Sequence, residues 1–267
     1  MPKGAIDATG VGWFDVVGCE AGGPVARMTT LFRADLDHAV PAPPAELLVK
    51  IGTFGNPLYF KLGGLKLFGD LMEPILRHRG IESIRRLLDW GCGCGRVTAH
   101  FLMEPVIAEV FGCDVDREAV QWCSDHLKPG KFSRIAPRPP TPYEGSIFDV
   151  AVGISVFTHL ARDVQNAWLA EMARIIAPGG LFLASTHGEF AARFAFPETF
   201  TELLRDGIFS DIYDRWIDGI VPDGYYPDVY QTREYTVREW SKHFEIVEYV
   251  ERGAGNHQDL VVMRRRA

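Results

Sequence analysis

The chain has 267 residues, 47% of them hydrophobic and 24% charged, a composition typical of a folded globular protein rather than a disordered one. A net charge of -7 argues against nucleic acid as the main partner, because phosphate binding relies on clustered Lys and Arg. The cysteines number five, so no disulfide framework is expected and a reducing compartment is favoured. With no signal-peptide pattern and no apolar run long enough to span a bilayer, we expect a cytoplasmic protein without a membrane partner.

Residues 1–57 are predicted to form an N-terminal extension that packs over the main domain or over its cleft. The first 45 residues are rich in Gly, Ala and Pro, with short strands expected at 13–17 and 28–32. Disorder of the first ten residues is the alternative. A short helix over 45–51 then leads into a turn cluster that ends at Pro57.

Residues 58–267 are predicted to form one domain in which strands alternate with helices. Such alternation predicts a Rossmann-like, doubly wound α/β fold: a mostly parallel sheet with helices on both faces. Strands are expected near 87–89 and at 107–113, 131–135, 148–154 and 181–185, and helices over 58–79, 95–103, 117–127 (with Asp116 as N-cap) and 163–176.

The last third of the chain departs from this alternation. Residues 189–235 are irregular and rich in aromatic side chains, which predicts a lid insertion that carries substrate specificity. Thr236 and Glu239 have the spacing of a capping box, which predicts a helix from there to His243. Segments 244–250 and 260–263 are expected to close the sheet as an antiparallel pair.

A glycine-rich turn follows the first strand of this domain. Asp89 ends a short apolar run, and Gly91, Gly93 and Gly95 follow at alternate positions before a helical pattern begins. Glycine tolerates the positive φ of a tight turn and leaves room for a ligand close to the backbone. A dinucleotide loop requires a third glycine where this chain has Arg96 or Thr98, so NAD and FAD are disfavoured. The Gly-Lys pair of a phosphate-binding P-loop is also missing from this turn.

Asp89 and its three glycines, with Asp114 at the end of the next strand, resemble the class I S-adenosylmethionine-dependent methyltransferases, in particular a bacterial small-molecule branch. Further segments resemble motifs of that family in the same order: Phe111–Asp114, Phe148–Val152, Ser155–Leu160 and Ala177–Gly180. The resemblance covers roughly residues 60–190, with a weaker similarity at 228–264. It implies S-adenosyl-L-methionine as the cofactor.

The resemblance also implies roles for individual residues. The main chain of 91–95 would hold the amino-acid part of the cofactor beside Asp89, and Asp114 would bind the ribose hydroxyls. The implied cofactor-binding residues are Asp89, Gly91, Cys92, Gly93, Gly95, Asp114, Val115 and Ser155. A turn acid at Asp89 and an N-cap at Asp114 are the alternatives, with Asp116 competing for either role of Asp114. Because 136–140 contain no acid, adenine is expected to meet backbone groups and apolar contacts near Ile135 and Ala136.

Three histidines are candidates for a general base, since histidine titrates near neutral pH. His159 and His187 follow strand ends on the expected ligand edge, and His257 lies in a glycine-rich turn. For each, a structural histidine is the alternative. Cys92, Cys94 and Cys113 could approach one another, but no ligand set with zinc spacing accompanies them and no metal is expected.

The resulting prediction is a methyltransferase that acts on an oxygen or nitrogen of a small molecule or glycan. A cofactor-binding regulatory or assembly protein without methyl transfer is one alternative, and a methyltransferase acting on a protein is another. The aromatic side chains at 190–230 favour a carbohydrate, lipid-like or aromatic acceptor, although they would also suit the core of a lid. No oligomeric state is predicted.

Overall fold

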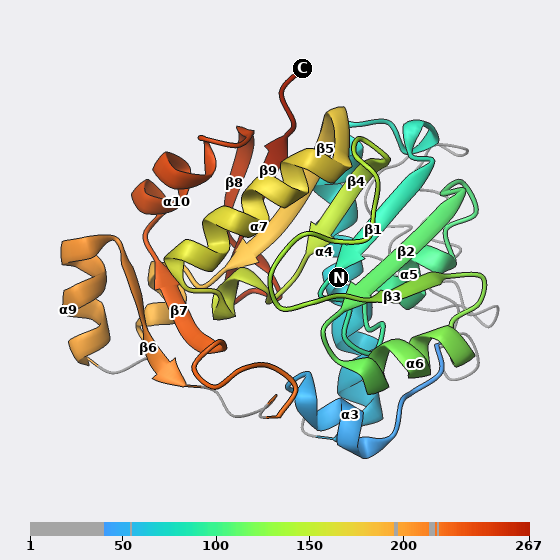
Figure 1. Ribbon diagram of the computed structural model, residues 1–267, viewed down its shortest axis with the longest axis horizontal. Helices are drawn as coiled ribbons and strands as arrows, with labels where there is room; N and C mark the ends of the chain where they lie inside the picture. The colour runs from blue at the N-terminus through green and yellow to red at the C-terminus, as the bar shows by residue number, and fades with distance from the viewer. Residues whose placement is uncertain (1–39, 54, 195–196, 214–216, 218) are drawn as a thin grey trace, which may run out of the picture.

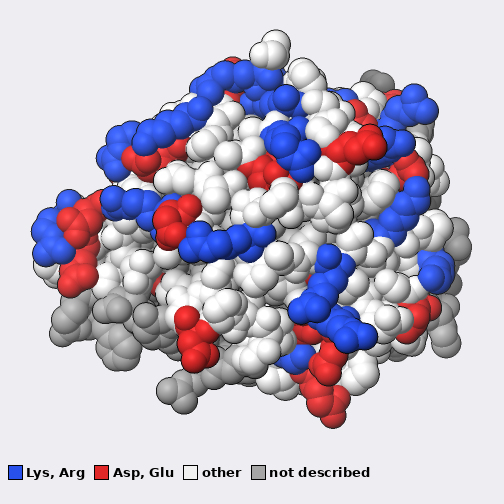
Figure 2. Space-filling model, in the orientation of Figure 1, with Lys and Arg blue, Asp and Glu red and all other residues white. Residues whose placement is uncertain are grey.

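A computed structural model of the chain describes residues 40–53, 55–194, 197–213, 217 and 219–267 (Figure 1). The strands expected at 13–17 and 28–32, and the question of order in the first ten residues, lie outside the described residues. Within the described part, no helix is long and apolar enough to cross a membrane. On the face shown in Figure 2, Lys and Arg side chains are interspersed with Asp and Glu.

The centre of the fold is a seven-stranded sheet with the strand order β3-β2-β1-β4-β5-β9-β8. The neighbours from β3 to β5 pair in parallel, whereas β9 is antiparallel to both β5 and β8. This topology confirms the predicted Rossmann-like fold with an antiparallel closing strand. The strands are β1 (Arg86–Trp90), β2 (Glu109–Asp114), β3 (Lys131–Arg134), β4 (Phe148–Gly153), β5 (Ile176–Thr186), β8 (Glu245–Ala254) and β9 (Gln258–Arg264).

Helices cover both faces of this sheet because its strands carry apolar side chains on both faces. Successive side chains of a strand point to opposite faces, so both Leu87 and Leu88 of β1 are buried, in different clusters. Leu87 belongs to the cluster that contains apolar side chains of α4, and Leu88 belongs to the cluster that contains those of α7. Figure 1 shows α7 in front of the strands and α4 behind them. The helices of the sheet domain are α4 (Pro57–His78), α5 (Thr98–Leu102), α6 (Arg117–His126), α7 (Arg162–Ile175) and α10 (Arg233–Trp240), with short 3-10 turns η2 (Ile81–Ser83) and η3 (Phe157–His159).

The N-terminal helix α3 (Ala45–Lys50) packs against this domain. Val40, Leu47 and Leu48 are buried in a cluster that also contains Phe60 of α4 and Trp122 of α6. Burial of these apolar side chains is the main force that holds α3 in place. The described part of the predicted extension therefore lies on the main domain, beside α6 in Figure 1.

The predicted insertion at 189–235 contains two helices and a second sheet. Its elements are α8 (Glu189–Ala192), α9 (Pro197–Asp206), β6 (Ile208–Tyr213) and β7 (Pro227–Gln231), and β6 and β7 pair antiparallel. Tyr230 of β7 forms a bridge with His187, just after β5, and Gln231 N donates to His187 O at 2.9 Å. This bridge fixes β7 against the carboxyl end of β5.

The capping-box prediction at Thr236 was wrong by one helical turn. Helix α10 begins at Arg233, and its N-cap is Thr232, whose Oγ1 accepts a hydrogen bond from Tyr235 N at 3.1 Å. Thr236 lies inside the helix, is fully buried and donates its hydroxyl hydrogen to Thr232 O at 2.9 Å. Threonine suits both positions locally, and the earlier start is the one that buries Tyr235 and Thr236.

The strand expected from residue 181 is also longer than predicted. Strand β5 already begins at Ile176, which pairs with Phe148, and it runs through Pro178. On the other side of the strand, Gly179 N donates to Arg265 O and Arg265 N donates to Gly180 O. These backbone hydrogen bonds involve the residues after Pro178, because a proline has no N–H to donate.

Two glycines with the same backbone conformation provide a stability test. Gly95 has φ +78 and a Cβ there would lie 2.2 Å from Leu127 Cδ1, whereas Gly179 has φ +75 and open space around it. We expect Gly179→Ala to lower the free energy of unfolding by about 1 kcal/mol through backbone strain alone. Gly95→Ala should cost a further ~1–3 kcal/mol because the side chain overpacks the core. Urea unfolding measures both, and equal losses would contradict the steric argument.

Candidate functional site

A cavity of about 310 Å³ opens at the carboxyl edge of the sheet. It lies where β1 and β4 are neighbours although two other strands separate them in sequence, the switch point at which open α/β sheets bind ligands. The glycine loop after β1, the segment after β4 and the turn after α3 line it together with residues of the loop before β7. Figure 1 shows this loop reaching toward α3 below the sheet.

The glycine loop is closely packed against the segment after β4. Gly91 has φ +73, and a Cβ at this position would lie 2.3 Å from Val156 Cγ2. The backbone N–H groups of Gly91 and Cys92 both donate to Cys113 O, at 2.8 and 3.1 Å. These contacts leave no room for a side chain at Gly91, so the turn is fixed between its two neighbours.

Asp114 links this loop to the next strand. Its Oδ2 accepts a hydrogen bond from Gly93 N at 2.7 Å, and its Oδ1 accepts one from Asp116 N at 2.8 Å. Burial raises the pKa of Asp114, and these two donors oppose the rise. The N-cap of α6 is Asp116, which accepts from Glu118 N and Ala119 N, so Asp114 does not have that role.

Asp89 is buried at the base of the cavity. Its Oδ2 accepts a hydrogen bond from Thr98 Oγ1 at 2.5 Å, and the residue is 4% exposed. Burial raises the pKa of this carboxyl to about 6, because desolvation penalises the charged form more than Thr98 stabilises it. A cationic group placed beside Asp89 would therefore stabilise its carboxylate.

Ser155 is held in an unusual conformation at the opposite side of the loop. It has φ 59, a region that non-glycine residues rarely adopt. Its N–H donates to Ser185 Oγ at 2.8 Å, and its hydroxyl accepts from Gln258 Nε2 at 2.9 Å. Gln258 also lines the cavity and was missed from sequence, where only the neighbouring His257 was singled out. Because β9 is antiparallel, its first residue, Gln258, lies at the ligand edge.

The outer wall of the cavity is largely aromatic and apolar. It includes Trp168 of α7 and Ile217, Val221, Tyr225 and Tyr226 of the loop before β7. Trp168 Nε1 donates to Pro137 O at 3.1 Å, and the Tyr225 hydroxyl donates to the same carbonyl. The loop before β7 is thereby fastened to the loop after β3. Ile217, Val221 and the two tyrosines belong to the insertion predicted at 189–235, whereas Trp168 had no predicted role in the site.

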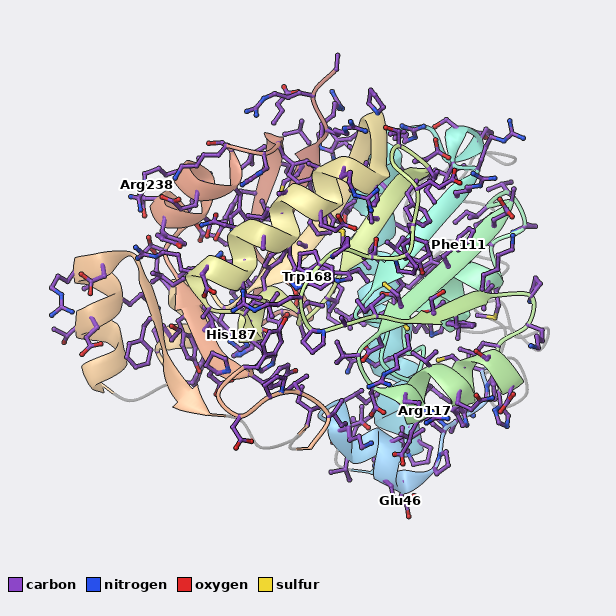
Figure 3. All side chains as sticks on the ribbon, in the orientation of Figure 1. Glu46, Phe111, Arg117, Trp168, His187 and Arg238 are labelled. Atoms are coloured by element: carbon purple, nitrogen blue, oxygen red, sulfur yellow. The ribbon has the colours of Figure 1, made fainter. Side chains whose placement is uncertain are left out.

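His159 is the candidate base that lines the cavity. Its ring stacks on Tyr226 with centroids 3.9 Å apart, and its Nδ1 lies 3.5 Å from Asp228 Oδ1. His187 lies behind it, with ring centroids 6.2 Å apart, and His257 lies a further 5.8 Å beyond His187. Figure 3 shows His187 beside β7 and Trp168 on α7. Among the described residues, His187, His257 and Gly95 of the expected site are not part of the cavity lining.

Burial keeps His159 and His187 neutral. It lowers the pKa of His159 to about 3 and that of His187 to about 4, and a neighbouring histidine adds to each effect. Cys92 and Cys94 line the cavity but are buried free thiols, whose pKa values burial and neighbouring groups raise. In the part of the chain that the structure describes, no group of three or more metal-type ligands was found.

The turn after α3 completes the cavity. Leu47, Lys50, Ile51 and Gly52 line it, although sequence reasoning had assigned no individual site residue before Asp89. Lys50 Nζ lies 2.9 Å from Asp116 Oδ2 and 2.9 Å from Glu118 Oε2, so α3 is tied to the start of α6. The turn around Gly52 can be predicted from the sequence, but the sequence does not indicate that this turn faces the cavity.

Comparison with known proteins finds similar methyltransferases. Residues 88–182 match the family model described as a methyltransferase domain. The chain is 27% identical over 154 residues to a ubiquinone biosynthesis O-methyltransferase of Maricaulis maris, an alignment that spans 52% of this chain and 56% of that protein. Residues 88–182 are therefore similar to a methyltransferase domain.

Solved structures of methyltransferases share the fold of this chain. An S-adenosylmethionine-dependent methyltransferase from Methanosarcina mazei has a TM-score of 0.54 and 18% identity, with 72% of this chain and 97% of that chain covered. An S-adenosylmethionine-bound amino pentose methyltransferase from Micromonospora echinaspora has a TM-score of 0.51 and 19% identity, with 74% and 89% covered. At these identities the likeness shows the fold, and S-adenosyl-L-methionine as the cofactor of this chain stays a prediction.

The contacts of Asp114 make it the first residue of this cavity to test as a ligand of the expected cofactor. We expect Asp114→Ala to weaken binding of S-adenosylhomocysteine by at least ~10-fold, because both the ribose acceptor and the support of Gly93 are lost. Asp163→Ala serves as the control, since Asp163 lies at the surface of α7 and pairs with Arg138. Isothermal calorimetry measures both affinities, and an unchanged affinity for Asp114→Ala would remove the ribose assignment.

The buried histidines predict an acid-sensitive fold. Between pH of about 4 and 6.5 the folded chain leaves His187 neutral while the unfolded chain protonates it, so stability is lost as pH falls through this window. His187→Phe should flatten the dependence of the unfolding free energy on pH by up to ~1.4 kcal/mol per pH unit. Chemical unfolding of both proteins at pH steps from 7.5 to 5 provides the test, and parallel curves would show that His187 contributes nothing.

Proposed function

We propose that this chain transfers the methyl group of S-adenosylmethionine to a hydroxyl oxygen of a small, largely apolar molecule. The observation that carries the proposal is one cavity with two different walls. Asp89, the glycine loop and Asp114 form the inner wall, and His159 lies with Trp168 and Tyr226 on the outer wall. The curated O-methyltransferase relative supports oxygen as the acceptor atom, although the alignment covers 56% of that protein.

The inner wall fits the groups of the cofactor. Asp89 offers a desolvated carboxylate for the ammonium of the amino-acid part, and its pKa of about 6 indicates how poorly its charge is compensated without one. Each oxygen of Asp114 accepts one backbone hydrogen bond and keeps a lone pair for a ribose hydroxyl. Ile135 and Pro137 line the cavity beyond Val115, where the apolar contact expected for adenine would lie. When bound, S-adenosylmethionine supplies a sulfonium methyl group for in-line displacement.

The outer wall fits the task of aligning and deprotonating an acceptor. Largely buried His159 is neutral at physiological pH and has a ring nitrogen for the hydroxyl proton, but its lowered pKa makes it a weak base that needs a neighbouring anion. Asp228, 3.5 Å from its Nδ1, would stabilise the imidazolium that forms. Trp168, Tyr225 and Tyr226 exclude water from the acceptor and hold it against the inner wall. Such alignment is worth on the order of 7–11 kcal/mol when the geometry is good.

Turnover with a panel of acceptors tests the proposal. The purified chain is incubated with S-adenosylmethionine and, in turn, with phenols, aliphatic alcohols, primary amines, reducing sugars and an unfolded protein. Formation of S-adenosylhomocysteine and of the methylated product is followed by mass spectrometry. We expect turnover with a hydroxyl acceptor. Turnover only with amines or protein would overturn the oxygen assignment, and binding without turnover across a wide panel would favour the regulatory alternative.

The role of His159 gives a more specific prediction. His159→Gln should lower kcat by roughly 10²–10⁴-fold because the general base is lost. Affinity for S-adenosylhomocysteine should stay within about twofold, since the cofactor groups lie on the other wall. His257→Gln is the matched control, because His257 lies outside the cavity and should change kcat little. A larger loss of kcat in the His257 variant than in the His159 variant would contradict this assignment and indicate His257 as the base.

A further inference from the structure

Two cationic side chains line the cavity, and their surroundings differ. Lys50 Nζ lies 2.9 Å from the carboxylates of both Asp116 and Glu118, so its charge is already neutralised. Arg96, directly after the glycine loop, has a different environment. The hydrogen bond found for its guanidinium among the described residues runs from Nη1 to Ile51 O, at 3.5 Å, a long contact with a neutral carbonyl.

The position of Arg96 is fixed by the helix that packs on it. Gly64 of α4 lies against its backbone, and a Cβ on Gly64 would be 2.2 Å from Arg96 O and 3.1 Å from Arg96 Cγ. The missing side chain at Gly64 therefore lets α4 hold the base of the Arg96 side chain. Such a constrained arginine loses little further conformational freedom when it binds a ligand.

Arg96 and Asp89 both line the cavity. Each affects the other electrostatically: Arg96 opposes the rise in the pKa of Asp89, and Asp89 opposes the fall that burial causes in the pKa of Arg96. Within the described residues each makes its hydrogen bond elsewhere, Asp89 with Thr98 Oγ1 and Arg96 with Ile51 O. A desolvated cation and a desolvated anion thus line the same cavity without a direct bond to each other.

An α-amino acid has the complementary arrangement, since its ammonium and carboxylate groups are joined through one carbon atom. The planar guanidinium fork of arginine binds a carboxylate through two parallel hydrogen bonds. We infer that Arg96 binds the carboxylate of the cofactor's amino-acid part while Asp89 faces its ammonium. This inference rests on the proposed cofactor site and adds a residue that the sequence had used only to exclude a dinucleotide loop.

The test compares two ligands that differ in the amino-acid part. S-adenosylhomocysteine carries the amino-acid part, whereas 5′-methylthioadenosine keeps the adenosine and the thioether but lacks it. Calorimetry of the full chain should show that Arg96→Met weakens binding of S-adenosylhomocysteine by about 10- to 100-fold. Affinity for 5′-methylthioadenosine should stay within about twofold, because this ligand has no carboxylate to lose.

Two further variants separate ligand recognition from support of the fold. Lys50→Met removes the other cavity cation and should change both affinities by the same factor, since its partners are protein carboxylates. Arg96→Lys keeps the charge without the fork and should recover part of the affinity for S-adenosylhomocysteine. If thermal unfolding shows that Arg96→Met does not fold, Arg96→Lys still tests the inference.

The outcomes distinguish this inference from the proposed function. Equal loss of both ligands in Arg96→Met or in Arg96→Lys, or no loss of either, would overturn the role of Arg96 and leave the cofactor site in place. If the unaltered chain bound neither S-adenosylhomocysteine nor 5′-methylthioadenosine, the proposed cofactor site itself would fail. A selective loss confined to S-adenosylhomocysteine supports the inference.

Discussion

The close approach of the loops after β1 and β4 is the constraint on which this molecule depends. The two strands are neighbours in the sheet but distant in sequence, and Gly91 accepts Val156 in the space that a side chain would fill. This contact brings the glycine loop beside Ser155, whose strained backbone is held by Ser185 and Gln258. One packing contact between the two loops thereby positions the inner wall of the cavity, and Asp114 extends the same arrangement to β2.

The two walls of the cavity have different structural origins. The inner wall is built from the ends of parallel strands, where rigid backbone and buried carboxylates define polar positions. The outer wall combines His159 and Trp168 with an insertion that is attached through the His187–Tyr230 bridge and the hydrogen bond from Tyr225 to Pro137 O. Because loops tolerate sequence change better than strands do, the two walls can vary independently in evolution. A shared cofactor and a variable acceptor are the natural result of such a division.

Sequence reasoning named most of the described residues on the inner wall and few of those on the outer wall, for physical reasons. Asp89, Gly91, Gly93 and Asp114 belong to short strand–turn–helix units, so a local pattern brings them to the cavity lining, from which Gly95 is absent. Gln258, Trp168 and Lys50 reach the cavity only through tertiary packing, which a local pattern does not contain. The choice between Thr232 and Thr236 as N-cap was decided by burial of α10, although both residues have suitable local chemistry. For the histidines, strand ends indicated the correct edge but not the order in depth from His159 to His257.

The antiparallel direction of β9 has a practical consequence. Its first residue, Gln258, lies at the cavity, so the strand leads the chain away from the site, and the C-terminus leaves the sheet beyond Arg264 (Figure 1). An affinity label or a surface linker attached after Ala267 would hold the molecule by the end remote from its cavity. Immobilised in this way, the chain would present its opening to solution, which suits it to screening of acceptor libraries on a solid support.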